Sequence, residues 1–228
     1  MPRTSRRAAS AARQETAPRP LLKDRAYAQL KDLIQSGAYA PDTFLSERQL
    51  VEKLGMSKTP IRSALEHLEA QGLVAVSPQQ GIVVKDLSAR EIAELFDMRL
   101  AVEPFVARRL AERTLTTAQR ALIKRSLTQQ RAAVRDEDPR AATRFDIEFH
   151  LLLAELLENR ELCAWLRRCF DKLERAILRI NRLAPNRLAK SQADHSAVAH
   201  AILKSQADRA AQAMTDHLQY GRQFLLNA

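Results

Sequence analysis

Two side chains that could bind a metal ion lie four residues apart in the middle of the chain. Asp146 and His150 would project from one face of a helix, because residues four apart lie about one turn above each other. Phe145 and Phe149 share or flank that face, which predicts that it is buried. A buried carboxylate and imidazole need partners, since an unpaired buried polar group costs about 1–3 kcal/mol. Each could satisfy the other, and such an Asp–His pair is more often a satisfied pair than a metal site.

Two further histidines could complete a metal site. His195 and His217 lie among apolar residues on two later predicted helices. Together with Asp146 and His150 they would offer three imidazoles and one carboxylate, a donor set for a borderline divalent ion such as Zn²⁺ or Ni²⁺. The spacing alone does not show that the four residues converge. His200 lies about 140° round its helix from His195, so we exclude it from the site.

A second set of polar residues lies at the start of a short helix in the N-terminal half. Ser57 is its predicted cap, and Pro60 fits the first turn because the N–H groups there have no intrahelical acceptor. Apolar residues such as Ile61 face inward. The outer face then offers groups suited to phosphates and base edges: Ser57, Lys58, Thr59 and Arg62. An ordinary amphipathic helix with a solvated polar face is the alternative.

The elements around this helix favour the interpretation that it binds DNA. We expect a helix over 23–36, a helix that Ser46 and Gln49 begin with a capping box and Gly55 ends, a third helix that ends at Gly72, and β-type runs at 73–76 and 82–85. Three helices followed by a β-hairpin is the order of a winged helix-turn-helix. This order makes DNA binding the stronger interpretation.

The rest of the chain has helical periodicity to its end. Six helices are predicted over 89–113, 116–135, 139–158, 161–183, 185–205 and 207–226. We therefore predict a mostly α protein in three parts: a disordered basic arm at 1–20, a winged helix-turn-helix with a small β-hairpin wing at 21–85, and a C-terminal all-α bundle at 86–228.

Composition narrows the class of protein. The chain of 228 residues has a net charge of +10, and positive charge is densest in the first twenty residues, as expected for a polyanion partner. Cys163 and Cys169 would lie about 9 Å apart on one helix, too far for a disulfide, which indicates a reducing compartment. The sequence has no apolar run of membrane-spanning length. The N-terminal arm lacks the apolar core of a secretory signal, and a disordered arm is a simpler interpretation than a transit peptide. We expect a cytoplasmic protein with no membrane partner.

The N-terminal motifs resemble a known family. The segment LSERQLVEKLGMSKTPIRSALEHLEAQGLV and the later QQGIVV are similar to the DNA-binding domain of GntR-family transcription regulators, over roughly residues 21–85. The resemblance implies contacts to double-stranded DNA through Arg48, Ser57, Lys58, Thr59 and Arg62, with Gln80 and Gly81 at the tip of the wing. Lys58 stands where arginine is usual, which replaces a bidentate guanine contact by a point charge. Asp42 replaces the usual glycine in the preceding turn.

The C-terminal motifs resemble the ligand-binding FCD domain of the FadR branch of that family. DIEFH at 146–150, Asn159, DHSAVAHAILKSQADRAA and TDHL carry the resemblance over roughly residues 88–225, and six helices rather than seven resemble the VanR-type variant. It implies that Asp146, His150, His195 and His217 hold a divalent metal, zinc or alternatively nickel or manganese. Arg99 and Asn159 would bind the effector. Arg99 could instead form a helix pair with Glu103, and Asn159 could be a helix cap.

These interpretations combine into one functional prediction. We expect a transcription regulator and not an enzyme: a homodimeric repressor on a palindromic operator, controlled by a small carboxylate metabolite at the metal. Control would pass through residues 86–88. A purely structural or directly sensed metal is one alternative. A helical metalloenzyme is the other, and it is disfavoured because no motif places a glutamate or further base beside the four ligands.

Overall fold

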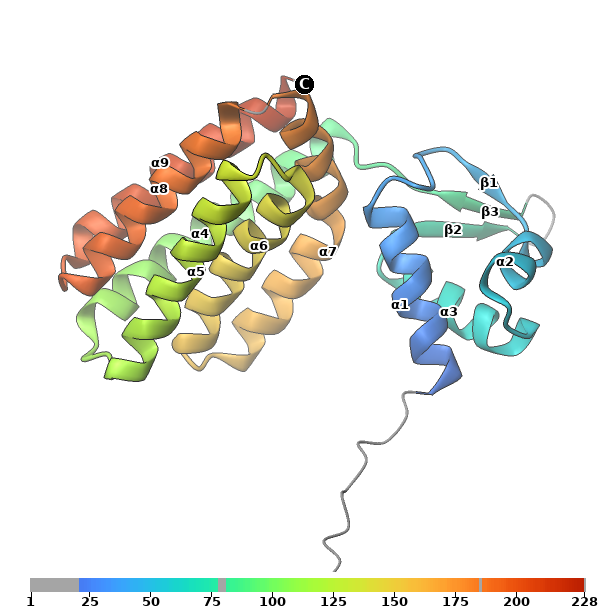
Figure 1. Cartoon of the computed structure of the whole chain (residues 1–228), viewed down its shortest axis with the longest axis horizontal. Helices are drawn as coiled ribbons and strands as arrows, with labels where there is room; N and C mark the ends of the chain where they lie inside the picture. Colours follow the sequence, from blue (N-terminus) through green and yellow to red (C-terminus); the bar gives the residue numbers. More distant parts are fainter. Residues whose placement is uncertain (1–20, 78–80, 185, 228) are drawn as a thin grey trace, which may run out of the picture.

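The computed structural model describes residues 21–77, 81–184 and 186–227. Figure 1 shows a small N-terminal part with the strands and a larger helical bundle, which meet beside one long helix. The predicted basic arm at 1–20 and Gln80 lie outside the described residues.

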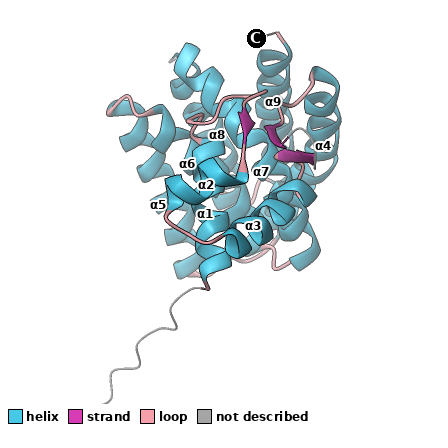
Figure 2. Ribbon diagram, turned by 90° about the vertical axis from the view of Figure 1, so that its right-hand side faces the viewer, coloured by secondary structure: helices cyan, strands magenta, loops and turns pink. Residues whose placement is uncertain are grey.

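The N-terminal part has three helices and a small antiparallel sheet. Its elements are α1 (Leu22–Gln35), β1 (Phe44–Leu45), α2 (Glu47–Leu54), α3 (Lys58–Ala70), β2 (Val74–Ser77) and β3 (Gly81–Val84). The strand order is β1-β3-β2, and Figure 2 shows these strands beside the helices. Leu30, Ile61, Leu68 and Ile82 are among the buried side chains that join the helices to the sheet. This order of elements is that of a winged helix-turn-helix.

Local signals in the sequence explain these elements. The predicted capping box of Ser46 and Gln49 begins α2, and Gly55 ends it in the left-handed conformation. Asp42 also has a left-handed φ of 62°, which a short polar side chain tolerates in place of glycine. Gly81 has a φ of 89°, and a Cβ there would lie 2.8 Å from the Leu45 carbonyl oxygen. The close contact of β1 with β3 therefore requires a glycine.

The C-terminal part is an all-α bundle, as predicted. Its helices are α4 (Ala89–Glu112), α5 (Thr117–Arg135), α6 (Pro139–Leu156), α7 (Arg160–Leu183), α8 (Asn186–Leu203) and α9 (Ala207–Leu226). α4 packs along α9, and both contact α8. Capping boxes begin α4 at Ser88 and α5 at Thr116. Among the described helices, none is long and apolar enough to cross a membrane.

α7 is the bundle helix beside the N-terminal part (Figure 1). Lys31 of α1 lies 2.5 Å from the Asp171 carboxylate on α7. Arg175 and Arg179 of α7 both contact the carboxylate of Asp86, at 3.1 and 3.3 Å. The segment that joins the two parts is thus held against α7 by charged side chains.

Candidate functional site

The structure brings together the four predicted metal ligands. Asp146 and His150 of α6, His195 of α8 and His217 of α9 each offer one ligand atom, and these atoms lie within 4.8 Å of one another. The Nε2 atom of His195 is 3.2 Å from that of His150 and 3.1 Å from that of His217. Three imidazoles from three helices therefore point the same ring nitrogen at one position.

The opposite nitrogen of each imidazole faces an acceptor on the protein. His195 Nδ1 is 2.8 Å from Gln130 Oε1 on α5, His150 Nδ1 contacts Glu103 Oε2 on α4, and His217 Nδ1 is 3.8 Å from Asp194 Oδ2. A proton on Nδ1 that is donated to Gln130 or Glu103 leaves a lone pair on Nε2 of His195 and of His150. The separation of 3.8 Å at His217 is longer than a hydrogen bond. Partners of this kind fix the orientation of metal-binding histidines.

Burial keeps two of these imidazoles neutral. Desolvation and the nearby His217 lower the pKa of His195 well below its usual value. Desolvation also lowers the pKa of His217, although Asp194 works in the opposite direction. Burial opposes the charge on Asp146, but the histidines and the Ser191 hydroxyl, 2.7 Å from Oδ1, outweigh it and lower the pKa of this carboxyl. Asp146 is therefore in its carboxylate form and His195 and His217 are in their neutral forms, the forms that bind metals.

The donor set and its spacing fit a divalent metal ion. With metal–nitrogen bonds of about 2.1 Å, neighbouring ligand atoms lie about 3.0 Å apart in octahedral and about 3.4 Å apart in tetrahedral geometry. The observed separations of 3.1 and 3.2 Å fall between these values. Lone pairs that face one another at this distance repel unless a cation lies between them. Imidazole and carboxylate ligands suit zinc, nickel or manganese.

Arg99 lies beside this cluster and is buried. Its Nη2 is 3.3 Å from His150 Nε2, and its Nε is 2.5 Å from Glu103 Oε1. The predicted Arg99–Glu103 pair thus exists, but it is buried in the cluster and not exposed. Burial opposes the charge on Glu103, yet Arg99 and His150 lower the pKa of this carboxyl to about 2. Phe96 and Phe170 lie under the Arg99 guanidinium, 4.9 and 4.6 Å from it.

One sequence expectation needs correction. Asp146 and His150 do not simply satisfy each other: their closest atoms are 4.0 Å apart, and His150 is paired with Glu103 instead. Glu103 contacts His150, although no motif in the sequence places it beside the ligands. It does so on the side away from the other imidazoles, so it orients a ligand rather than facing the ligand position. Gln130 and Asp194 were likewise not predicted.

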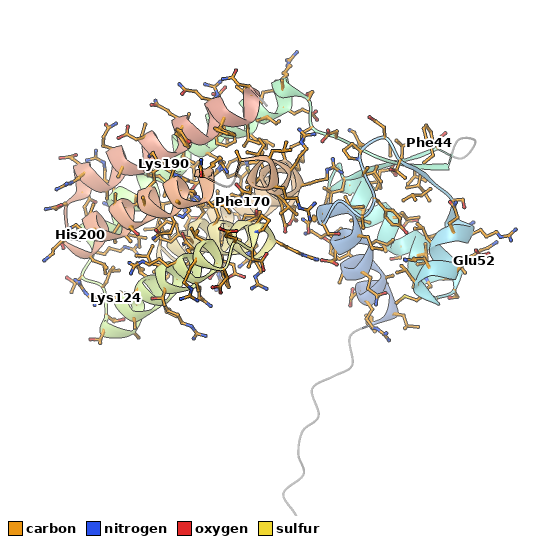
Figure 3. The ribbon with its side chains drawn as sticks, turned by 45° about the horizontal axis from the view of Figure 1, so that its top comes forward. Phe44, Glu52, Lys124, Phe170, Lys190 and His200 are labelled. Atoms are coloured by element: carbon orange, nitrogen blue, oxygen red, sulfur yellow. The ribbon has the colours of Figure 1, made fainter. Side chains whose placement is uncertain are left out.

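Asn159 and His200 lie away from the buried cluster. Asn159 is exposed at the start of α7, where its side-chain oxygen accepts a hydrogen bond from Leu162 N at 3.0 Å. It is a helix cap, the alternative that the sequence left open, and its position does not support effector binding. His200 is exposed on the outside of α8 (Figure 3), as its place on the helix predicted.

The predicted DNA contacts share an exposed surface on α2 and α3. Its members in the described residues are Arg48, Ser57, Lys58, Thr59 and Arg62, all exposed. Arg62 Nε is 2.8 Å from Glu47 and Arg48 Nε is 3.0 Å from Glu52, and exposed pairs of this kind are weak enough to exchange for phosphate. Ser57 takes the cap position, but its side chain makes no capping hydrogen bond. Gly81 begins β3 next to the wing tip.

Comparisons with known proteins agree with this division of the chain. Residues 22–84 match the family described as "Bacterial regulatory proteins, gntR family", and residues 94–220 match the FCD domain. An uncharacterized HTH-type transcriptional regulator, YdfH, from Escherichia coli O6:H1 is 28% identical over 89% of this chain and 88% of its own length. The HTH-type transcriptional repressor RspR of Escherichia coli K12 is 28% identical over 79% of this chain and 78% of its own length.

Solved structures show the same fold. Escherichia coli McbR/YncC superposes with a TM-score of 0.79 at 21% identity, covering 92% of this chain and 99% of that protein. A putative GntR regulator from Rhodococcus sp. RHA1 gives a TM-score of 0.79 at 22% identity, covering 90% and 98%. The chain belongs to the GntR family of bacterial transcription regulators, in the FadR-like branch with a C-terminal FCD domain, and it is a DNA-binding regulator and not an enzyme.

Proposed function

We propose that this regulator is a repressor whose affinity for its operator is set by a small carboxylate bound at a metal ion in the FCD domain. The observation that carries the proposal is the convergence of three imidazole nitrogens and the Asp146 carboxylate. A divalent ion, zinc in the first place, would be held by Asp146, His150, His195 and His217. It would supply a Lewis acid to which a carboxylate can bind.

Arg99 is placed to receive the same carboxylate. Its Nη2 lies 3.3 Å from His150 Nε2, a lone pair that a metal ion would take over. The guanidinium then has a free donor pointing at the ligand position, while Glu103 keeps its Nε. A charge-assisted hydrogen bond from arginine is a strong and directional way to fix a carboxylate.

A homodimer is proposed from an apolar stripe on the outside of α4. Met98 and Phe105 are 47% and 50% exposed. Leu95 precedes Met98 by three residues and Val102 lies between Met98 and Phe105, which gives the alternating three- and four-residue spacing of a helix-pairing seam. A second copy of the chain packed on this stripe would cover it by two-fold symmetry. Two α3 helices would then read the two halves of a palindromic operator from adjacent major grooves.

The link at residues 86–88 would carry the control. Arg175 donates to the Lys85 carbonyl and to Asp86, and Arg179 contacts Asp86. A ligand that favours one position of α7 would therefore favour one position of the DNA-binding domain. Repression is supported by RspR, a relative described as a repressor. A regulator that acts on chromosomal DNA would work in the cytoplasm.

A structural or directly sensed metal is the second candidate. It is favoured by the enclosure of the site: the cavity lined by Asp146 has a volume of about 10 Å³, room for about one water molecule. Under this alternative the ion itself would control DNA binding.

One experiment separates these functions. The full-length protein is prepared with zinc, without metal, and with zinc restored, and operator binding is measured with and without small carboxylates. Carboxylate-dependent binding only in the zinc forms supports the proposed function. Control by zinc alone supports the sensed metal, and loss of the folded bundle on metal removal supports the structural metal.

A further inference from the structure

A second buried arginine lies in the bundle without an acidic partner. Arg187 of α8 is only 7% exposed. Among the described residues, its side chain makes one hydrogen bond, from Nη1 to Asn181 Oδ1 at 2.7 Å, and no ion pair. Its Nε is buried without a partner. Arginine cannot lose its proton in a protein interior, so this charge is costly unless an anion compensates it.

Arg187 belongs to a polar layer next to the histidine cluster. On α8, Arg187, Ser191 and His195 follow one another at one-turn intervals on the inner face, and Ser191 donates to the ligand Asp146. On α9, Gly221 lies one turn after His217, and a Cβ at Gly221 would be 3.5 Å from Arg187 Nη2. The guanidinium therefore lies about one helical turn, roughly 6 Å along the bundle, from the metal ligands.

The hydrogen-bonded chain from Arg187 continues through the core. Asn181 of α7 donates to Thr143 Oγ1 at 2.8 Å, and Thr143 lies one turn before Asp146 on α6. The narrow cavity of about 10 Å³ is lined by both Asp146 and Asn181. The cavity that reaches Asp146 thus also reaches Asn181, the partner of Arg187, although a ligand larger than water must widen it.

The fixed charges of the core determine the net charge that a ligand at this position must carry. The core holds two arginines, Arg99 and Arg187, and two carboxylates, Glu103 and Asp146, so its summed charge is zero although no carboxylate forms an ion pair with Arg187. Asp194 is paired with Lys190 at the edge. A divalent ion on the histidines would therefore add two uncompensated positive charges to a dry interior. A ligand with two negative charges restores neutrality, whereas a monocarboxylate leaves one charge unmatched.

We propose that the effector is a short dianionic acid, with one carboxylate at the metal and Arg99 and the second at Arg187. This inference rests on the proposed metal-dependent function and specifies its ligand. Arg187 exchanges or shares its hydrogen bond with Asn181 when the second carboxylate binds. It selects diacids over monoacids of the same length, because only a diacid satisfies both buried guanidinium groups.

The test compares diacids and monoacids on zinc-loaded full-length protein. Malonate, succinate and glutarate are matched in length with propionate, butyrate and valerate, and affinity is measured by calorimetry and thermal shift. We expect at least one diacid to bind about 10-fold or more tightly than its monoacid partner, the value of one charge-assisted hydrogen bond. Equal affinities within every pair overturn the diacid proposal but leave carboxylate control intact. If no acid binds the zinc-loaded protein, both the diacid proposal and the proposed control by a carboxylate are overturned.

Arg187 variants test the assignment of the residue. Arg187→Met should abolish the preference for the diacid and leave bound zinc unchanged by elemental analysis. Without ligand its melting temperature should equal or exceed that of the wild type, since an unpaired buried charge has been removed. Arg187→Lys should retain part of the preference. A lower melting temperature of Arg187→Met with the diacid preference intact would make Arg187 structural and overturn the proposal.

Discussion

The Nε2 atoms of His195 and His217 lie 3.1 Å apart in the buried interior of the bundle. Gln130 and Asp194 face their Nδ1 atoms. Contact between two acceptor nitrogens is unfavourable in a dry core, and a cation between them, as proposed above, would remove this repulsion.

Loss of one histidine should remove the metal. His195→Ala is expected to lower bound metal from about one ion per chain to a small fraction of that amount, because three protein ligands bind zinc less tightly than four. His200→Ala is the matched control, since His200 is exposed on the same helix. Elemental analysis of both purified variants gives the answer. Unchanged metal in His195→Ala would exclude that residue from the site.

Metal binding should stabilise the bundle. An ion at about 1,000 times its dissociation constant adds about 4 kcal/mol to the free energy of unfolding, or about 10 °C in melting temperature for a domain of this size. Calorimetry before and after treatment with a chelator measures the difference. If the chelator removes the metal from the wild-type protein and the melting temperature does not change, metal binding to the folded bundle is contradicted.

The orienting glutamine should tune affinity for the metal. Gln130→Leu removes the acceptor of His195 Nδ1 without leaving a buried charge, and metal affinity should fall about 10- to 100-fold. Gln129→Leu makes the same change one residue earlier, at a partly exposed position, and should bind metal normally. Competition with a fluorescent zinc chelator compares the two. Equal affinities would show that Gln130 does not orient the ligand.

The metal-free protein should lose stability in weak acid. Burial lowers the pKa of His195 and His217 in the folded state, whereas in the unfolded chain both bind a proton as the pH falls through about 6.5. Below that pH the unfolded state holds more protons than the folded state, so the free energy of unfolding decreases as the pH is lowered. Above that pH this contribution is constant. Urea unfolding at pH 8, 7, 6 and 5.5 measures the effect. Replacing both histidines by alanine should flatten the dependence, and an equally steep curve in that variant would assign it elsewhere.

Arg62 should be essential for operator binding. Arg62→Ala is expected to weaken binding about 10- to 100-fold, the value of a lost base-edge contact. Arg90→Ala is the control, because Arg90 is a similarly exposed arginine on α4 that also pairs with a glutamate. Both proteins should have the wild-type mass in solution. Specific binding retained by Arg62→Ala in an electrophoretic mobility assay would place the recognition surface elsewhere.

The α4 stripe should hold the dimer together. Glutamate at both Met98 and Phe105 places like charges against each other across a two-fold interface, so the variant should be monomeric by light scattering. Leu22→Glu, at a residue 57% exposed on α1, should leave the mass unchanged. A dimer retained by the double variant would require another interface.

Elements with local signals could be predicted from the sequence. The capping box at Ser46 predicted the start of α2, and the helices predicted from 89 and 116 begin within one residue of α4 and α5. The strand β1 was missed because it has two residues, Phe44 and Leu45, which are too few to show the alternating pattern of a strand. They form a strand only because β3 lies beside them.

The metal ligands were predictable in type but their surroundings were not. Asp146 and His150 are neighbours on one helix, and the family resemblance supplied His195 and His217. Glu103 and Gln130 come from α4 and α5, and no spacing in the sequence relates them to the histidines that they contact. Arg187 was missed for the same reason, since a lone arginine on a predicted helix is normally a surface residue.

Two consecutive residues of α7 connect the interior of the bundle with the DNA-binding part. Asn181 is buried and accepts a hydrogen bond from Arg187, and Arg182 donates to the Ser36 carbonyl after α1, at 3.3 Å. Consecutive helical residues are fixed about 100° apart, so a rigid-body rotation of α7 moves both contacts in one step. Communication between the two parts then requires neither local unfolding nor flexibility of the segment that joins them. Its sensitivity is set by how tightly one helix is held against rotation.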